Sequence, residues 1–189
     1  GKFFAVDYAG ISPDIMCISK GLTNGYMSMA AVATTEEIYN GFLGDYESHR
    51  AFMHSHTYAG NPLAASVANA TLRIIERDHV IEKANEMAPW LNQRFHELFD
   101  DNPNVGEVRS IGLINAIELV EDKETKKAFD SSLRLGYRIY RKALEKGLML
   151  RPLGDVMYFN PPLIISKEEL EEALDICKWA VDEVLDEIN

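Results

Sequence analysis

The residues whose types are best suited to a chemical reaction lie at positions 19–26, where the sequence is Ser-Lys-Gly-Leu-Thr-Asn-Gly-Tyr. Lys20 ends a short apolar run and precedes a glycine-rich turn. Burial lowers the pKa of a lysine amine and makes it nucleophilic, and such an amine can form an imine with an aldehyde cofactor. The same pattern also fits a lysine whose ammonium reaches solvent from the end of a strand. This segment alone leaves both interpretations open.

A second group lies at positions 52–62, Phe-Met-His-Ser-His-Thr-Tyr-Ala-Gly-Asn-Pro. The hydroxyl of Thr57 and nearby backbone N–H groups can hold a phosphate ahead of a helix, because the helix dipole favours an anion there. His54 and His56 would share a face if extended, but a metal site needs a third and a fourth ligand. The other histidines form no such set, so we expect no metal. The simpler alternative is a capped loop leading into a helix.

Arg151 follows an apolar run, Leu148–Leu150, and precedes a Pro-Leu-Gly-Asp turn. A guanidinium at the end of a strand can bind a carboxylate through two parallel hydrogen bonds. Pairing with a structural acid such as Asp155 is the commoner role. We expect Arg109 to be structural within its own strand.

Composition excludes several classes of protein. The formal net charge is -11 and apolar residues make up 47% of the chain. These values favour a folded core and argue against nucleic acid or an anionic membrane as a partner, since both need a basic face. No apolar run approaches membrane-spanning length. Cys17 and Cys177 lie in separate apolar runs, so we expect buried free thiols in a reducing, cytoplasmic compartment.

The elements that must position these residues fall into two regions, which we predict as domains of residues 1–78 and 79–189. The first region has short apolar strands at Asp14–Ser19 and Ala30–Ala33, and the former is patterned for burial on both faces. A region with only these few strands resembles the last part of a larger sheet. We therefore expect an unpaired sheet edge and exposed apolar surface.

Caps and periodicity predict the helices. Thr34 and Glu37 form a capping box for a short helix, and Asn61-Pro62 begins a longer one. In the second region the residue pattern first predicts a helix ending near residue 100 and strands at 105–111 and 113–120. It then predicts a helix at 131–145, strands at 148–151 and 156–159, and a last helix capped by Ser166 and Glu169. This alternation indicates a small α+β domain, and the whole chain belongs to the α/β class.

The order of these segments carries more information than any one of them. Residues 10–23 resemble the cofactor-lysine segment of the class III aminotransferases, which belong to the fold-type-I superfamily of pyridoxal-phosphate enzymes. Residues 54–62 resemble the second signature of the family and residues 105–113 the start of its small domain; the match continues through residues 118–126, 154–155 and 160–165. The resemblance implies the C-terminal part of the fold-type-I transferase fold, namely the end of the large-domain sheet followed by a small α+β domain.

The resemblance also implies roles for individual residues. Lys20 would be the Schiff-base lysine for pyridoxal 5'-phosphate and would move protons between the substrate and the cofactor. Thr57 would bind the cofactor phosphate in the partner subunit of a homodimer, with His56 among the cofactor-binding residues. Ser55, which replaces the usual glycine of the family, would line the substrate pocket. Arg151 matches an arginine that binds a substrate carboxylate.

Several alternatives stay open on the sequence alone. The implied reaction is transamination between an ω-amino acid or amine and a keto acid, but the run 151–156 is similar to diaminopelargonic acid synthases of biotin synthesis. An aminomutase or decarboxylase would use the same cofactor. An isolated non-catalytic dimerisation domain is a further alternative, although it gives no reason for Lys20 and Thr57 to occur together.

The sequence opens at Gly1 without an initiator methionine, which suggests an internal start. The family places the acidic residue under the pyridine nitrogen upstream of this point. We therefore expect the polypeptide alone to be inactive as a transaminase, and robust turnover by it would contradict that expectation.

Overall fold

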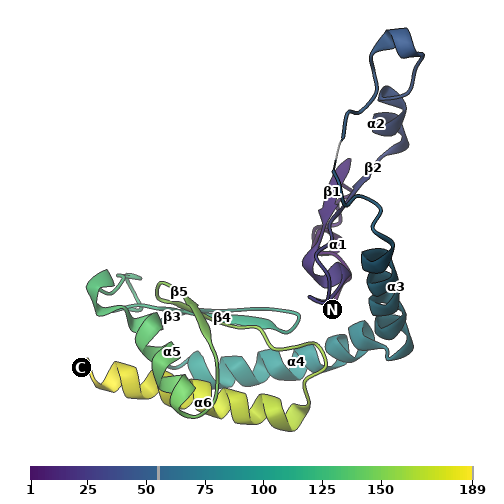
Figure 1. Cartoon of the computed structure of the whole chain (residues 1–189). Helices are drawn as coiled ribbons and strands as arrows, with labels where there is room; N and C mark the ends of the chain where they lie inside the picture. The colour runs from purple at the N-terminus through teal and green to yellow at the C-terminus, as the bar shows by residue number, and fades with distance from the viewer. Residues whose placement is uncertain (55, 189) are drawn as a thin grey trace. The chain divides into compact units, whose positions relative to one another are not determined.

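The computed structural model describes residues 1–54 and 56–188. It divides into an N-terminal unit, Lys2–His79, and a C-terminal unit that runs from Val80 to the end of the described chain and also includes Gly1. The N-terminal unit contains α1 (Val6–Ala9), β1 (Ile15–Ile18), the 3-10 turn η1 (Lys20–Leu22), β2 (Ala31–Thr34), α2 (Glu36–Gly41), the 3-10 turn η2 (Tyr46–Ser48) and α3 (Pro62–Arg77) (Figure 1). The C-terminal unit contains α4 (Val80–Phe99), β3 (Val105–Ile111), β4 (Ile114–Leu119), the 3-10 turn η3 (Ser131–Leu133), α5 (Leu135–Glu145), β5 (Arg151–Leu153), β6 (Val156–Phe159) and α6 (Lys167–Asp186).

Strands β1 and β2 form an antiparallel pair in which Ile15 lies opposite Thr34. The prediction that the first strand is buried on both faces is wrong, because Ile15 is 58% exposed and Cys17 is an exposed free thiol. An apolar run makes a strand suited to burial, but the described residues leave these side chains uncovered. Cys177 is buried as predicted, and burial raises the pKa of its thiol to about 12.

The two N-terminal helix caps had different outcomes. Helix α2 is capped by Thr35, whose Oγ1 accepts a hydrogen bond from a backbone N–H at 3.4 Å. The predicted cap, Thr34, instead pairs with Ile15 in the β ladder, which holds it extended. Asn61 caps α3 as predicted, and its Oδ1 accepts from Leu63 N at 3.0 Å.

The C-terminal unit is an antiparallel sheet of order β3-β4-β6-β5 with α4, α5 and α6 against one face (Figure 1). Alternate residues of the central strands β4 and β6 are buried beneath the helices, as the two-residue period of a strand requires. The core lies between the two layers, and its largest fully buried side chains include Phe95, Phe99, Leu91, Ile117, Leu119, Leu135, Ile139, Leu170 and Leu174. Among the described residues, no helix has both the length and the apolar character needed to cross a membrane.

Two predicted boundaries in this unit are shifted. Strand β5 begins at Arg151 and not at Leu148, because Leu148 N donates to Ala143 O at 3.1 Å and so belongs to the end of α5. Gly147, with φ of +86°, turns the chain there. Helix α5 begins at Leu135, later than predicted, because the separate turn η3 precedes it. The Ser166–Glu169 capping box of α6 is confirmed.

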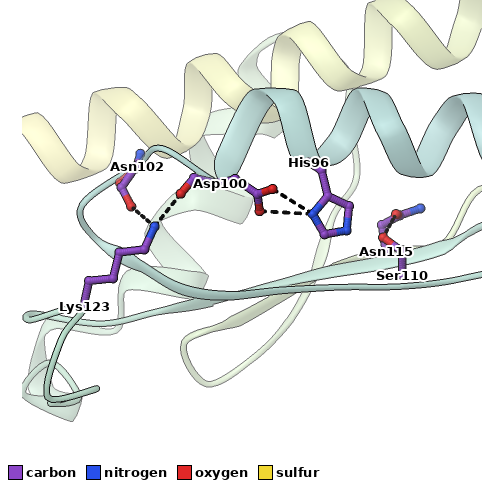
Figure 2. Close-up of polar contacts among 6 residues, drawn as sticks. All are labelled: His96, Asp100, Asn102, Ser110, Asn115 and Lys123. Atoms are coloured by element: carbon purple, nitrogen blue, oxygen red, sulfur yellow. Dashed lines mark hydrogen bonds and ion pairs between the residues drawn. The ribbon is translucent and has the colours of Figure 1, made fainter.

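Polar contacts tie the loops of the sheet to the helix layer (Figure 2). Lys123 Nζ donates to the backbone carbonyl of Asp100 and, at 3.2 Å, to that of Asn102, where α4 ends. Ser110 Oγ donates to Oδ1 of Asn115, which is completely buried. The loop after β4 is thus fixed to the end of α4, and the β3–β4 hairpin is fixed from within.

Candidate active site

Lys20 is the first residue of η1 and follows β1 closely in the chain. Its backbone φ is +51°, in the left-handed region that is unfavourable for residues other than glycine. The buried position that the sequence suggested is not observed. The side chain is exposed, and its amine makes no hydrogen bond or ion pair with the residues that the structure describes. Strained backbone of this kind collects at functional sites, and the amine is free to react.

Two hydrogen bonds from side chain to backbone close the loop that carries Lys20. Ser19 Oγ donates to Met29 O at 3.2 Å, and Thr23 Oγ1 donates to Met27 O. Thr23 is only 2% exposed, and the turn that it follows packs on α3. Lys20 and Thr23 both line a hollow of about 470 Å³ inside this loop. Sequence reasoning missed Thr23, because a threonine in a glycine-rich turn gives no local sign of burial.

The hydrogen bond of Thr23 predicts a measurable effect on loop stability. Thr23→Val keeps the shape of the side chain and removes the donor, at a cost of about 1 kcal/mol for one hydrogen bond. We expect the backbone amides of residues 19–29 to exchange hydrogen roughly 5-fold faster in this variant. Thr23→Ser retains the hydroxyl and serves as the control, with exchange near the parent rate. Unchanged exchange in the valine variant would show that this bond does not hold the loop.

His56 and Thr57 lie in the exposed turn that precedes α3. The rings of His54 and His56 stack with centroids 6.0 Å apart. Asn61 already caps α3, and the hydroxyl of Thr57 has no hydrogen-bond partner among the described residues. It can therefore accept a ligand. Ser55, the predicted substrate-binding residue, lies outside the described residues, and the described part of the chain has no group of three or more side chains suited to a metal ion.

Arg109 and Arg151 lie in one row across the open face of the four-stranded sheet. Arg109 lies opposite Ala116, Ala116 opposite Tyr158, and Tyr158 opposite Arg151. The next row of the ladder is largely buried against the helices. Because successive residues of a strand point to opposite faces, the row with the arginines faces away from the core.

The two arginines differ in their electrostatic surroundings. Arg109 Nη1 lies 2.7 Å from Glu107 Oε2 and 2.9 Å from Glu118 Oε2, and these hydrogen bonds raise the pKa of its guanidinium. The predicted structural role of Arg109 is thus confirmed. Arg151 is exposed and forms no ion pair within the described residues, so the alternative of a pair with Asp155 is not observed. Its guanidinium is available for an anion.

Arg151 borders a groove of about 270 Å³ on the C-terminal unit. The lining combines polar Tyr158 and Asn160 with apolar side chains, among them Leu148, Met149, Leu150, Ile165 and Ala173. An apolar groove with one unpaired guanidinium suits an aliphatic chain that ends in a carboxylate. Lys20, His56 and Thr57 belong to the N-terminal unit, whereas Arg151 belongs to the C-terminal unit.

Solved structures define the class of fold to which this chain belongs. The crystal structure of adenosylmethionine-8-amino-7-oxononanoate aminotransferase from Methanocaldococcus jannaschii matches 91% of this chain and 39% of its own, with 42% identity and a TM-score of 0.85. The PMP-bound form of an aminotransferase from Vibrio fluvialis matches 97% of this chain and 40% of its own, with 30% identity and a TM-score of 0.87. The fold is therefore that of the fold-type-I transaminases, as predicted.

Sequence comparison narrows the class to one family. The family Aminotransferase class-III matches residues 1–181. The adenosylmethionine-8-amino-7-oxononanoate aminotransferase of Aquifex aeolicus is 43% identical over 188 residues, which are 100% of this chain and 41% of that protein. The chain belongs to the class-III aminotransferases. It spans about two fifths of the length of the curated relatives that it matches.

Proposed function

We propose that the protein containing this chain is a pyridoxal-phosphate-dependent aminotransferase that moves an amino group from an ω-amino acid or amine to a keto acid. The observation that carries the proposal is the amine of Lys20. In a chain of the class-III family, it stands exposed and without a partner on a strained loop beside a hollow of about 470 Å³. A primary amine with these properties can bind the aldehyde of a cofactor.

The residues of the N-terminal unit fit such a cofactor. Pyridoxal phosphate, when bound, supplies an electron sink for the substrate. Lys20 would hold the cofactor and move the proton at the substrate Cα. The free hydroxyl of Thr57 would donate to the phosphate of the cofactor held by the partner subunit of a dimer, and Ser55 and His56 would line the pocket of that subunit.

Arg151 supports a substrate that carries a carboxylate distant from its amine. Its unpaired guanidinium suits the carboxylate of an ω-amino acid, and the adjoining apolar groove suits the aliphatic chain. A second candidate is diaminopelargonic acid synthase activity, the alternative noted for residues 151–156. It is favoured because several relatives, at 38–43% identity, are named adenosylmethionine-8-amino-7-oxononanoate aminotransferases. Both candidates assign the same role to Arg151.

We further propose a homodimer whose subunits share the active site. Large side chains of the N-terminal unit stand exposed, including Tyr46 at 90%, Met53 at 90% and Tyr58 at 77%, and a second subunit would bury them. In this arrangement residues 1–78 are part of the large cofactor-binding domain and residues 79–189 form the small domain. The free cysteines fit the cytosol. A purely non-catalytic interaction domain would not need the amine of Lys20.

Chemical trapping tests the proposal. The complete polypeptide is incubated with pyridoxal phosphate, reduced with borohydride and digested, and the modified lysines are mapped by mass spectrometry. We expect selective labelling of Lys20, and its loss in Lys20→Ala. Lys2→Ala is the matched control, because Lys2 is another exposed lysine of the same unit, and it should leave the label in place. A complete polypeptide that is labelled elsewhere but not at Lys20 would rule out the proposed cofactor lysine.

A further inference from the structure

The turn between β5 and β6 lies directly against the first turn of α5. A Cβ atom built on Gly136 would lie 2.1 Å from Gly154 O and 2.8 Å from Pro152 Cβ. Only a glycine at position 136 therefore allows this approach without a shift of backbone. Because Pro152 faces α5, strand alternation directs its neighbour Arg151 to the opposite, open face. The position of Arg151 thus depends on how this turn is held.

Asp155 holds the turn at two points. Its backbone carbonyl accepts from Leu119 N of β4 at 3.0 Å. Its carboxylate lies close enough to the backbone N–H of Gly136, in the first turn of α5, for that amide to lower the pKa of the carboxyl group. That end of the helix has no capping bond from its own N-cap residue, Arg134, and the Asp155 carboxylate approaches the unpaired N–H groups there from a distant part of the chain.

Partial burial raises the pKa of Asp155, while the amide of Gly136 lowers it to a smaller extent. A carboxyl group whose pKa is raised by folding contributes most to stability below its unfolded pKa, and this contribution is lost as the pH rises through the folded value. At neutral pH the ionised carboxylate is therefore less favourable for stability than a neutral acceptor of the same shape. Asp155→Asn keeps an acceptor for the Gly136 amide and should be at least as stable as the parent.

We infer that Asp155 is a positioning residue for substrate binding: by joining the β5–β6 turn to the first turn of α5, it fixes the strand that presents Arg151. This inference rests on the proposed function, because Arg151 must bind the substrate carboxylate. Asp155 itself does not form an ion pair with Arg151 among the described residues. Its effect on substrate is transmitted through the backbone of β5.

The test compares two amino donors in the complete polypeptide with its cofactor. These are γ-aminobutyrate and propylamine, which is the same molecule without the carboxylate. Asp155→Ala removes the acceptor, and we expect it to raise KM for γ-aminobutyrate roughly tenfold, as for loss of one hydrogen bond, with little change for propylamine or in kcat. Asp155→Asn should restore KM to near the parent value. In an Arg151→Ala background, Asp155→Ala should add no further rise, because both act on one interaction.

Amide hydrogen exchange supplies a readout that does not depend on substrate. The amides of β5 and its turn should exchange roughly tenfold faster in Asp155→Ala and at the parent rate in Asp155→Asn. Equal effects on both donors, effects additive with Arg151→Ala, or an asparagine variant as impaired as the alanine variant would overturn the inference. If Arg151→Ala leaves both KM values unchanged, the proposed carboxylate site fails, and exchange alone then decides whether Asp155 fixes β5.

Discussion

Replacing Lys20 by alanine should reduce transaminase turnover of the complete polypeptide by roughly 100- to 10,000-fold, the range for loss of a positioned acid–base group. The amine is the only part of the side chain that can both hold an aldehyde cofactor and transfer a proton. Alanine retains neither function. Single-turnover conversion of an amino donor, followed by cofactor absorbance, measures the effect directly.

Two further variants separate chemistry from charge at this position. Lys20→Arg keeps the positive charge but has no amine that can form an imine, so it should be as inactive as Lys20→Ala. Lys2→Ala should retain parental turnover. A small primary amine added to the medium should restore part of the proton transfer in Lys20→Ala. Turnover of the alanine variant within tenfold of the parent would contradict a catalytic role for Lys20.

Arg151→Ala should raise KM for γ-aminobutyrate by roughly 10- to 150-fold, since hydrogen bonds to a charged group contribute about 1.5–3 kcal/mol. KM for propylamine should change little, because that donor has no carboxylate. Arg151→Lys keeps the charge and loses the paired geometry of the guanidinium, so we expect an intermediate KM. Steady-state kinetics with both donors distinguish these outcomes.

Arg109→Ala is the matched control for this prediction. Arg109 lies in the same row on the same face of the sheet as Arg151, but its guanidinium is already engaged by Glu107 and Glu118. The Arg109→Ala variant should therefore have the parent KM for both donors. If Arg109→Ala raised KM for γ-aminobutyrate and Arg151→Ala did not, the substrate carboxylate would bind Arg109, and the proposed role of Arg151 would be wrong.

Features that depend on neighbouring residues could be predicted from the sequence. The cap at Asn61 and the capping box at Ser166 and Glu169 use hydrogen bonds between residues two or three positions apart. The turn at Gly147 needs only a residue that tolerates a positive φ. The ordered motifs around Lys20 and Thr57 were sufficient to identify the class-III family.

Features that depend on distant pairing were decided by the tertiary structure. Thr34 became the end of a strand because it pairs with Ile15, and the cap moved to the next residue. Arg109 is ion-paired because the β3–β4 register brings Glu118 beside it, whereas Arg151 has no acid beside it among the described residues. The contact of Asp155 with Gly136 likewise exists only after β5 packs on α5. The sequence by itself therefore determined the family and the caps at Asn61 and Ser166 and predicts Lys20 as the cofactor lysine. Packing and strand register determined which charged groups remain free, because those contacts join residues that only folding brings together.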